Sequence, residues 1–464
     1  MDTPSSPSEL PQELVKKYDR PGPRYTSYPT APVWSEAFGQ EQWFAALAEA
    51  DSHPDEPLAI YVHLPFCVKR CLFCACNVVI SKRDDVLEAY LDRLFREIDA
   101  VAERMPNRRK VSGMHWGGGT PTHLPSADIE RLFQKIATTF DILPDAELSI
   151  EVHPPVTTDE QLETLARLGF KRMSLGVQDL DPEVQELINR HQSLEQTEHV
   201  LLKARELGFD SVNFDLIYGL PGQTMETWNY TLDQVVRLKP DRLAIYSYAH
   251  VPWLHPHQER MPKERLPEPE LKIELLRTSA RRLPEEAGYV EIGFDHFALP
   301  GDEMAKAVEE HRLYRNFMGY TVKPASDYVG FGMTAISEVG HAFAQNHSKL
   351  NRWNDAIDAG HCGVHKGHAL DKDDQVRKII IERLMCNQRI AFAEVEGLSG
   401  QSMAEQFPEA WHALEDMEAD GLVERSAEEL VVTDLGRHFL RNVCMLFDRY
   451  LEEQVKEGRY SQTV

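Results

Sequence analysis

The sequence of 464 residues contains no long apolar run. No stretch approaches the roughly 18 consecutive apolar residues that a membrane-spanning helix requires. The opening segment MDTPSSPSEL has neither the basic part nor the apolar part of a secretory signal. We therefore expect a cytoplasmic protein that does not contact a membrane, in a compartment where thiols stay reduced.

Basic residues are outnumbered by acidic residues. The chain has 50 Lys and Arg against 75 Asp and Glu, which gives a formal net charge of −25. This excess of negative charge disfavours nucleic acid and anionic membranes as partners. An anionic substrate would need a local basic pocket.

Cysteine is rare, and four of the seven cysteines lie in the stretch YVHLPFCVKRCLFCAC, from Tyr61 to Cys76. Thiols this close together indicate a metal or iron–sulfur site rather than disulfides. Four thiolates could close a structural zinc site, although zinc usually takes its ligand pairs from two separate segments. In a 4Fe-4S cluster, three cysteines leave one iron open for a ligand from outside the protein. The isolated Cys362, Cys386 and Cys444 are expected to be small buried hydrophobic residues.

The amino-terminal region carries two predictions. Residues 1–13 are rich in Pro and Ser and are expected to be disordered. Residues 16–30, KKYDRPGPRYTSYPT, combine basic and Tyr residues with prolines that favour an extended arm, with a plain surface linker as the alternative. A helix is predicted over residues 35–50.

From residue 58 onward, strand-like and helix-like segments alternate, which is typical of an α/β protein. Strands are predicted at 58–64, 111–116, 147–153, 172–178, 211–219 and 242–249. Helices are predicted at 85–104, 127–139, 158–168, 182–207 and 225–237, and a further one at 268–287. Six βα units are fewer than the eight of a closed barrel, so a partial barrel is expected.

Polar and glycine residues follow the predicted strands. In such folds ligands bind at the carboxyl ends of the strands. The cysteine stretch follows the first strand, GGGTP (117–121) follows the second, and Glu151, Gln178 and Asp215 close later strands. Side-chain alternation places polar residues on the inner side of these strands, where they need partners. A tight turn at GGGTP and a solvated rim carboxylate at Glu151 are the alternatives without a ligand.

The last part of the chain is expected to form a separate domain. We predict a division into residues 1–54, 55–370 and 371–464. The third part reads as helices followed by a short hairpin, in a pattern similar to a winged helix. Residues 372–464 contain 11 Lys and Arg against 19 Asp and Glu, so they lack the basic face that DNA binding requires. A lid over a substrate is the preferred interpretation.

Two of these motifs together carry a resemblance. The spacing Cys67-x-x-x-Cys71-x-x-Cys74 after one strand, with GGGTP after the next, resembles the radical S-adenosylmethionine (SAM) superfamily. The added Cys76, the run YVHLPFC and the arm GPRYTSYPT are similar to its oxygen-independent coproporphyrinogen III oxidase family. The resemblance extends from about residue 14 to the carboxyl terminus.

The resemblance implies a partial (β/α)6 barrel with an amino-terminal arm and a smaller, mainly helical carboxyl-terminal domain. It implies a 4Fe-4S cluster on Cys67, Cys71 and Cys74 and one SAM at Tyr61, Gly118 and Glu151. A second SAM is implied at Phe73, Gly119, Thr120, Gln178, Arg190, Asp215, Ala249 and Ile336. The residues implied at the reacting centre are Tyr61, Glu151, Phe317 and Ile336. From its sequence context, Arg190 could equally be a cation at a helix end.

Two later runs match the family with one exception. GFDHFAL (293–299) resembles its DHFA element, and RNFMGYT (315–321) resembles its RNFQGYT run. Met318 stands where Gln is usual, which puts in doubt any polar contact that this Gln makes.

The resemblance implies an enzyme of haem biosynthesis that converts two propionates of coproporphyrinogen III to vinyl groups with loss of carbon dioxide. The implied partners are the substrate and an electron donor such as flavodoxin or ferredoxin, and the protein is expected to be a monomer. Candidate cations for the substrate carboxylates are Arg24, His250, His296 and Arg315. A haem-binding chaperone and a methyl-transferring tetrapyrrole enzyme remain as alternatives.

Overall fold

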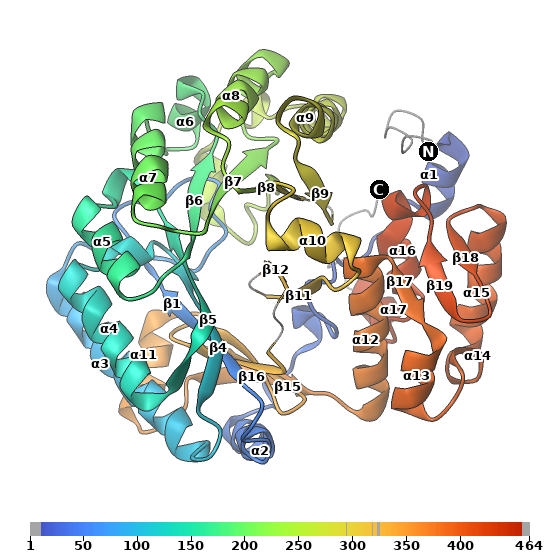
Figure 1. Cartoon of the computed structure of the whole chain (residues 1–464), viewed down its shortest axis with the longest axis horizontal. Coiled ribbons are helices and arrows are strands. Elements are labelled where there is room, and N and C mark those ends of the chain that lie inside the picture. The colour runs from blue at the N-terminus through green and yellow to red at the C-terminus, as the bar shows by residue number, and fades with distance from the viewer. Residues whose placement is uncertain (1–10, 294, 318, 323–324, 457–464) are drawn as a thin grey trace.

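The computed structural model describes residues 11–293, 295–317, 319–322 and 325–456. Its main body is a curved sheet with helices along its outer face (Figure 1). Neighbouring parallel strands of the sheet are β1 (Leu58–Leu64), β4 (Lys110–Gly118), β5 (Asp141–Val152), β6 (Arg172–Gln178), β7 (Ser211–Tyr218) and β8 (Arg242–Ser247). The outer helices are α3 (Asp84–Arg104), α4 (Ser126–Thr139), α5 (Asp159–Arg167), α6 (Pro182–Leu187), α7 (Leu194–Glu206) and α8 (Met225–Leu238). The predicted partial (β/α)6 barrel is confirmed.

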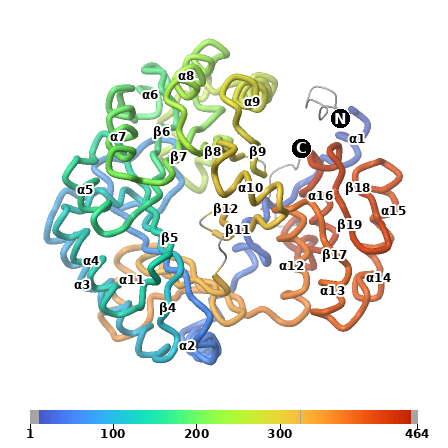
Figure 2. Tube along the Cα trace, viewed as in Figure 1, coloured from blue at the N-terminus to red at the C-terminus, as the bar shows by residue number. Residues whose placement is uncertain are grey.

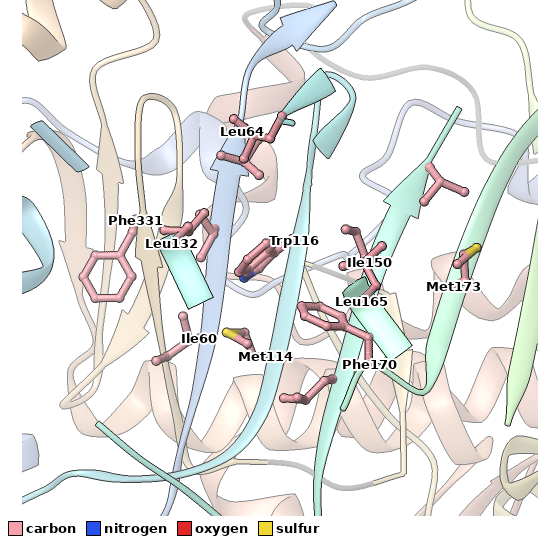
Figure 3. Close-up of a cluster of buried hydrophobic side chains, with 14 of the residues drawn as sticks. Ile60, Leu64, Met114, Trp116, Leu132, Ile150, Leu165, Phe170, Met173 and Phe331 are labelled. Carbon is pink, nitrogen blue, oxygen red and sulfur yellow. The ribbon is translucent and has the colours of Figure 1, made fainter. Parts of the chain in front are cut away.

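The side chains on the outer face of the strands form the main hydrophobic core. Ile60 and Leu64 of β1 and Trp116 of β4 are at most 1% exposed. Figure 3 shows them beside Leu132 of α4 and Leu165 of α5. Because side chains alternate along a strand, burial of this face turns the intervening residues toward the inside of the barrel.

The sheet continues beyond the predicted strands at both ends. Next to β1 it adds β13 (Asp327–Phe331), β14 (Ile336–Val339), β15 (Ala342–Asn346) and β16 (Val364–Ala369). Next to β8 it adds β10 (His296–Ala298) and β9 (Val290–Ile292). Strand β13 runs parallel to β1, so a seventh strand shares the direction of the barrel strands, which the sequence reading missed. Helix α11 (Leu350–Asp358) follows β15.

A buried carboxylate holds the added strands against the barrel. Glu97 of α3 is 4% exposed and accepts hydrogen bonds from Gly332 N at 2.7 Å, Asn346 Nδ2 at 2.8 Å and Trp353 Nε1 at 3.2 Å. These donors follow β13, end β15 and lie in α11, so one side chain ties three elements to α3.

The stretch 182–207, predicted as one helix, is two helices. Helix α6 ends at Leu187, and α7 begins at Leu194 behind the cap Ser193, whose hydroxyl accepts from Gln196 N. Between them Asn189 has a left-handed backbone, with a φ of 54°. The break matters because it carries the next residue, Arg190, to the cysteine loop.

The chain before the barrel differs from its prediction in part. Residues 12–18 form helix α1 (Gln12–Tyr18), which replaces expected disorder and the start of the extended arm. Helix α2 (Gln40–Asp51) begins five residues later than predicted. Residues 1–10 lie outside the described residues.

The carboxyl-terminal region forms a mainly helical unit beside the barrel (Figure 1). It contains α12 (Lys372–Asn387), β17 (Arg389–Ala391), α13 (Phe392–Ser399), α14 (Met403–Gln406), α15 (Pro408–Ala419), β18 (Val423–Arg425), β19 (Glu429–Val432), α16 (Leu440–Met445) and α17 (Leu451–Lys456). The predicted hairpin is the pair β18 and β19, and β17 joins it in a small sheet. The three-part division of the chain stays a prediction.

Shorter elements connect barrel and carboxyl-terminal unit. They are α9 (Pro269–Arg282), which continues as a π-helical turn to Ala287, α10 (Glu303–Glu309), β11 (Tyr314–Asn316) and β12 (Gly319–Thr321). The predicted helix over 268–287 is therefore confirmed. Within the described residues, no helix is both long enough and apolar enough to cross a membrane.

The amino-terminal arm runs along the carboxyl-terminal unit (Figure 2). Tyr18 Oη donates to Asp420 Oδ2 at 2.6 Å, and Tyr25 Oη donates to Asp448 Oδ2 at 2.9 Å. Asn442 Nδ2 donates to the carbonyl of Tyr18 at 2.7 Å. The amino-terminal arm and the carboxyl-terminal unit are thus joined by side-chain hydrogen bonds.

Candidate active site

The cysteine loop lies at the carboxyl end of β1. Two short strands, β2 (Phe66–Cys67) and β3 (Val79–Ile80), pair at its base. Cys67, Cys71 and Cys74 are half-buried, whereas Cys76 is exposed. Cys362, Cys386 and Cys444 are buried, as predicted.

The three half-buried thiols have an environment that suits an iron–sulfur cluster. Thr120 Oγ1 lies 3.5 Å from Cys67 Sγ, and Arg190 Nη1 donates to Cys71 Sγ at 3.7 Å. Hydrogen bonds to sulfur are one means by which proteins tune such clusters. A hydrogen bond from the Cys76 thiol is the largest influence on Cys74 and lowers the pKa of Cys74 to about 7.

Within the described ranges, no group of three His, Cys, Asp or Glu side chains converges on a point suited to one metal ion. A cubane cluster does not require such convergence, because each cysteine binds a different iron. The loop also borders two buried atoms, Arg190 Nε and His153 Nε2, that have no hydrogen-bond partner in the described part of the chain. These unpartnered atoms leave polar groups available to a bound ligand, so the residues present fit a cluster with SAM.

Gly118 and Glu151 meet where β4 and β5 end. Gly118 N donates to Glu151 Oε2 at 3.0 Å. Gly118 has a φ of 116°, and a Cβ there would lie 2.6 Å from the His63 ring, so only glycine fits. Burial would raise the pKa of Glu151, but hydrogen bonds from His115 and Gly118 lower it below its ordinary value. Glu151 is therefore an ionised acceptor at the barrel mouth.

Two histidines contact Tyr61 and hold its side chain in place. His63 is 5% exposed, and its Nε2 donates to the Asn77 carbonyl at 3.2 Å, since a carbonyl can only accept. Its Nδ1 then accepts from Tyr61 Oη at 3.0 Å. Burial lowers the pKa of His63 to about 4, which keeps it neutral. On the other side the Tyr61 ring stacks on His115, with centroids 6.0 Å apart.

His115 links Glu151 to the inside of the barrel. Its Nε2 lies 3.5 Å from Glu151 Oε1, and its Nδ1 shares a hydrogen bond of 2.7 Å with Ser149 Oγ. From the sequence, polar residues on the inner side of these strands are expected to need partners, but His115 is not identified as the partner of Ser149. The signal was present, because His115 is two residues before Gly117 and so shares its side of β4.

Asp215 is held by a similar arrangement on β6 and β7. Ser174 Oγ donates to its Oδ2 at 2.7 Å, and Asn213 Nδ2 donates to its Oδ1 at 2.8 Å. Burial raises the pKa of Asp215 to about 6. Ser149, Ser174 and Asn213 line a cavity of about 170 Å³ deeper in the barrel. The carboxylates of Glu151 and Asp215 thus each accept a hydrogen bond from a neighbouring strand.

Arg190 and Gln178 meet at the end of β6. Arg190 is 7% exposed, and its Nη2 donates to the Gly176 carbonyl. Gln178 has a left-handed backbone with a φ of 69°, and such strain in a non-glycine residue concentrates at functional sites. Arg190 is therefore not a plain helix-end cation, because it reaches across to the cysteine loop.

Phe73 and Ala249 are brought together by Gln258. Its Nε2 donates to the Phe73 carbonyl at 3.2 Å and to the Ala249 carbonyl at 3.4 Å. Gly119, whose amide donates to the Leu64 carbonyl at 2.9 Å, lies at the other side of the loop. These predicted ligand residues therefore border the cysteine loop.

Phe317 and Ile336 belong to a separate aromatic cluster. The Phe317 ring lies 5.4 Å from Trp34 and 5.9 Å from Phe343 by ring centroids, and Ile336 packs against the same group. Gly330 connects this cluster to the site. It pairs with Tyr61 in the register of β13 and β1, and it lies so close to Ile336 that a Cβ at Gly330 would clash with the Ile336 carbonyl. Met318 lies outside the described residues, so its predicted effect stays open.

Three of the four candidate cations gather around Asp295. Burial opposes ionisation of Asp295, yet His296, Arg315 and Arg24 together lower its pKa. His296 Nδ1 lies 2.5 Å from Asp295 Oδ1, and the buried Arg315 Nε has no hydrogen-bond partner among the residues described. His250 lies apart, with its Nδ1 2.9 Å from Tyr248 Oη.

Comparisons with known proteins agree with this arrangement. The Radical SAM superfamily model matches residues 61–235, and the HemN C-terminal domain model matches residues 370–439. The chain is 42% identical over 451 residues to the oxygen-independent coproporphyrinogen III oxidase of Escherichia coli (strain K12), covering 97% of this chain and 98% of that one. The protein of the same name from Synechocystis is 39% identical over 460 residues, or 98% of each chain.

The solved structures give the same result. The structure of coproporphyrinogen III oxidase (HemN) from Escherichia coli, a radical SAM enzyme, matches with a TM-score of 0.90 at 41% identity. The match covers 96% of this chain and 99% of that chain, so it includes the barrel and the carboxyl-terminal unit. The chain belongs to the radical SAM superfamily and, within it, to the oxygen-independent coproporphyrinogen III oxidase family.

Proposed function

We propose that this protein is the radical SAM enzyme that oxidises coproporphyrinogen III without oxygen in haem biosynthesis, yielding protoporphyrinogen IX. The similarity over nearly the whole chain, barrel and carboxyl-terminal unit together, is the observation that carries the proposal. Two propionate side chains lose carbon dioxide and become vinyl groups. The family uses a 4Fe-4S cluster and SAM as cofactors.

The cluster and SAM, when bound, supply the radical that removes a hydrogen atom from the β-carbon of a propionate. Cys67, Cys71 and Cys74 hold the cluster. Gly118 and Glu151 receive the SAM beside it, because an ionised acceptor and an unobstructed backbone meet there. The neutral His63 fixes the hydroxyl of Tyr61 at the same mouth.

The other predicted ligand residues serve a second SAM or its surroundings. Asp215 suits a ribose hydroxyl, since acidic residues after parallel strands bind ribose in other nucleotide sites. Gly119, Thr120, Gln178, Arg190, Phe73, Ala249 and Ile336 complete the proposed set. The hydrogen bonds that hold Asp215 orient its carboxylate before the ligand arrives, which reduces the entropic cost of binding.

The substrate carboxylates bind near Asp295, where Arg24, His296 and Arg315 lie. Arg315 has a buried nitrogen without a hydrogen-bond partner in the described part of the chain, and a guanidinium binds a carboxylate through paired donors. Arg24 comes from the amino-terminal arm, so in this proposal the arm contributes a cation to the site. The arm and the carboxyl-terminal unit together exclude water from the reacting centre.

The remaining proposals concern the setting of the enzyme. An acidic electron carrier such as flavodoxin or ferredoxin supplies the electron, the enzyme acts as a monomer in the cytoplasm, and neither nucleic acid nor membrane is a partner. The net charge of −25 supports the last point, because both of those surfaces are anionic.

An anaerobic assay with reconstituted protein tests the function. Mass spectrometry should show loss of two carboxyl groups from coproporphyrinogen and formation of 5′-deoxyadenosine. Tight haem binding without turnover under the same reducing conditions would favour a chaperone instead.

A further inference from the structure

A turn beyond β8 exposes two large hydrophobic side chains. We name residues 249–262 the Trp253 loop. The side chain of Trp253 is 74% exposed and that of Leu254 is 68% exposed, more than any other large hydrophobic side chain among the described residues. Exposed aromatic and aliphatic groups that lie next to each other mark surfaces for partners.

The Trp253 loop is held in place from within. Leu254 N donates to the Val251 carbonyl at 2.9 Å, and Val251 N donates to Gln258 Oε1 at 2.7 Å. Met261, at 2% exposure, packs in a hydrophobic cluster with Leu72 of the cysteine loop. Trp253 and Leu254 are thus presented on a supported turn.

The same loop touches the cysteine loop directly. His257 Nε2 donates to the Cys74 carbonyl at 2.7 Å, and Gln258 Nε2 donates to the Phe73 carbonyl at 3.2 Å. A protein that bound Trp253 would therefore lie beside the predicted cluster. Electron transfer between proteins falls steeply with distance, so an electron donor must dock at such a place.

Two chain segments at the Trp253 loop carry more basic than acidic residues, unlike the chain as a whole. Residues 67–83 contain four Lys and Arg and no Asp or Glu, and residues 249–266 contain three Lys and Arg against two Glu. Among the described residues, Arg70, Arg260 and Lys263 form no ion pair with a carboxylate, whereas Arg265 pairs with Glu183 at 2.5 Å. Arg70 Nη2 donates to the Val78 carbonyl at 3.1 Å. Arg70 and Lys263 lie near the loop, since their charges join burial in lowering the pKa values of His255 and His250.

We propose that Trp253 and Leu254, with Arg70, Arg260 and Lys263 around them, form the docking surface for a small acidic one-electron carrier protein. The inference rests on the proposed function and names the surface that its electron donor uses. One electron leaves the reduced prosthetic group of the carrier and enters at the cysteine loop, and no atom is transferred.

An acidic occupant follows from the charges. A chain with a net charge of −25 repels an acidic carrier over most of its surface, so a local cationic region selects where the carrier binds. Transient redox encounters bury small interfaces, below about 1,200 Å² in total, and a central apolar pair within a charged rim suits them. The macrocyclic substrate, which is also anionic, is the competing occupant.

The test compares two reductants on the cluster-loaded enzyme. The variant Trp253→Ala/Leu254→Ala and the variant Arg260→Glu/Lys263→Glu are assayed with dithionite and, separately, with an acidic flavodoxin kept reduced by its reductase. With dithionite, we expect turnover and the KM for coproporphyrinogen to stay within about twofold of wild type. With flavodoxin, we expect its apparent KM to rise about tenfold or more, which corresponds to about 1.4 kcal/mol.

A binding measurement provides a readout that does not depend on activity. Isothermal titration of oxidised flavodoxin into wild-type protein should show an affinity that falls with added salt, and both variants should bind more weakly. Matched controls are Leu202→Ala, which removes a 54% exposed leucine on α7, and Arg352→Glu on α11. Neither control should change the KM for flavodoxin.

Three outcomes would overturn the proposal, and one concerns the function instead. Unchanged flavodoxin kinetics and binding in both variants would show that the carrier does not dock at Trp253 and Leu254. Equal loss with dithionite and with flavodoxin would assign the surface to the substrate. An equal change in the two controls would make the effect nonspecific. If wild-type protein fails to turn over with dithionite, the proposed function itself fails.

Discussion

The mouth of the barrel and the seam between arm and carboxyl-terminal unit are built in different ways. At the mouth, each side chain is positioned by its strand, as when Gly118 on β4 meets Glu151 on the neighbouring β5. At the seam, Tyr25 bonds Asp448, 423 residues away in sequence, with no shared sheet. The register of a buried sheet is difficult to shift, whereas the seam depends on individual side-chain pairs. Substitutions at the mouth should therefore reduce cofactor binding and activity, whereas substitutions at the seam should let the arm separate from the carboxyl-terminal unit.

The cysteine loop should give the largest effect. We expect Cys71→Ala to remove the brown chromophore, the bound iron and SAM cleavage together, because a three-cysteine cluster has no replacement ligand. Cys76→Ala is the matched control, since Cys76 is exposed and is predicted to border the site without binding iron.

Iron analysis and absorption spectra of anaerobically purified variants decide this prediction. Equal loss of the cluster in both variants would show a four-cysteine site, with no iron left for SAM. Full iron content in Cys71→Ala would reject the ligand assignment.

The next effect concerns the carboxylates of the barrel mouth. We expect Glu151→Ala and Asp215→Ala to weaken SAM binding by roughly 10- to 150-fold, because a hydrogen bond to a charged group contributes about 1.5–3 kcal/mol. The cluster should assemble normally in both variants. Equilibrium binding of SAM to cluster-loaded protein measures the effect. Unchanged affinity in both variants would show that these carboxylates are solvated groups at the rim of the barrel that do not bind SAM.

The pH dependence sharpens this prediction for Asp215. Burial raises the pKa of its carboxyl to about 6, so the ionised acceptor is lost as the pH falls through that value. SAM affinity should therefore decrease below about pH 6. Asp215→Asn should lack this dependence, and an identical pH profile in that variant would assign it to another group.

Glu97 tests the attachment of the added strands to the barrel. Burial raises the pKa of Glu97 to about 7 despite hydrogen bonds from Gly332, Asn346, Trp353 and Gly363, so the folded protein binds this proton more tightly than the unfolded chain. The protonated Glu97 side chain therefore adds to the free energy of unfolding. This addition is complete below the pKa of Glu97 in the unfolded chain, and it is lost as the pH rises through about 7. Its size is on the order of 3 kcal/mol.

Glu97→Gln cannot titrate at this position, so its difference from wild type should change with pH. From about pH 5 to about pH 8, the unfolding free energy of wild type should fall relative to the variant by on the order of 3 kcal/mol. Urea denaturation followed by tryptophan fluorescence measures it. A constant difference across this range would show that Glu97 stays ionised in the fold.

The seam should give the smallest change. Tyr25→Phe removes one hydrogen bond to Asp448, worth about 0.5–1.5 kcal/mol, and leaves the ring buried. We expect faster proteolysis within residues 19–30 and an unchanged cluster spectrum. Protection equal to that of wild type would mean that the seam does not depend on this pair.

The same contrast explains what could be predicted from sequence. Five of the six parallel strands were placed within two residues of their bounds, because their alternation reflects burial on one face, whereas β5 begins six residues earlier than predicted. Strand β13 was missed since its pairing with β1 joins segments more than 260 residues apart, which no local pattern encodes. The break before α7 was also missed, although Ser193 and Gln196 form a capping box that announces a new helix.

For the candidate site, motifs and a resemblance identified the ligand residues, but they did not identify the side chains that hold those residues in place. The thiols and Gly118 were named from motifs that follow predicted strands, and Glu151 and Asp215 from predicted strand ends, although Asp215 lies three residues before the end of β7. His115 and Asn213 were not named, because a polar residue within a strand shows only that it needs a partner and not which partner the fold supplies.

The most direct test of the account follows a single hydrogen atom. Coproporphyrinogen carrying deuterium at the propionate β-carbons is turned over anaerobically with reduced, cluster-loaded protein and SAM. We expect deuterium in the 5′-deoxyadenosine, with one 5′-deoxyadenosine formed for each carboxyl group lost. Unlabelled 5′-deoxyadenosine, or decarboxylation that proceeds without it, would contradict removal of a propionate hydrogen by the SAM-derived radical.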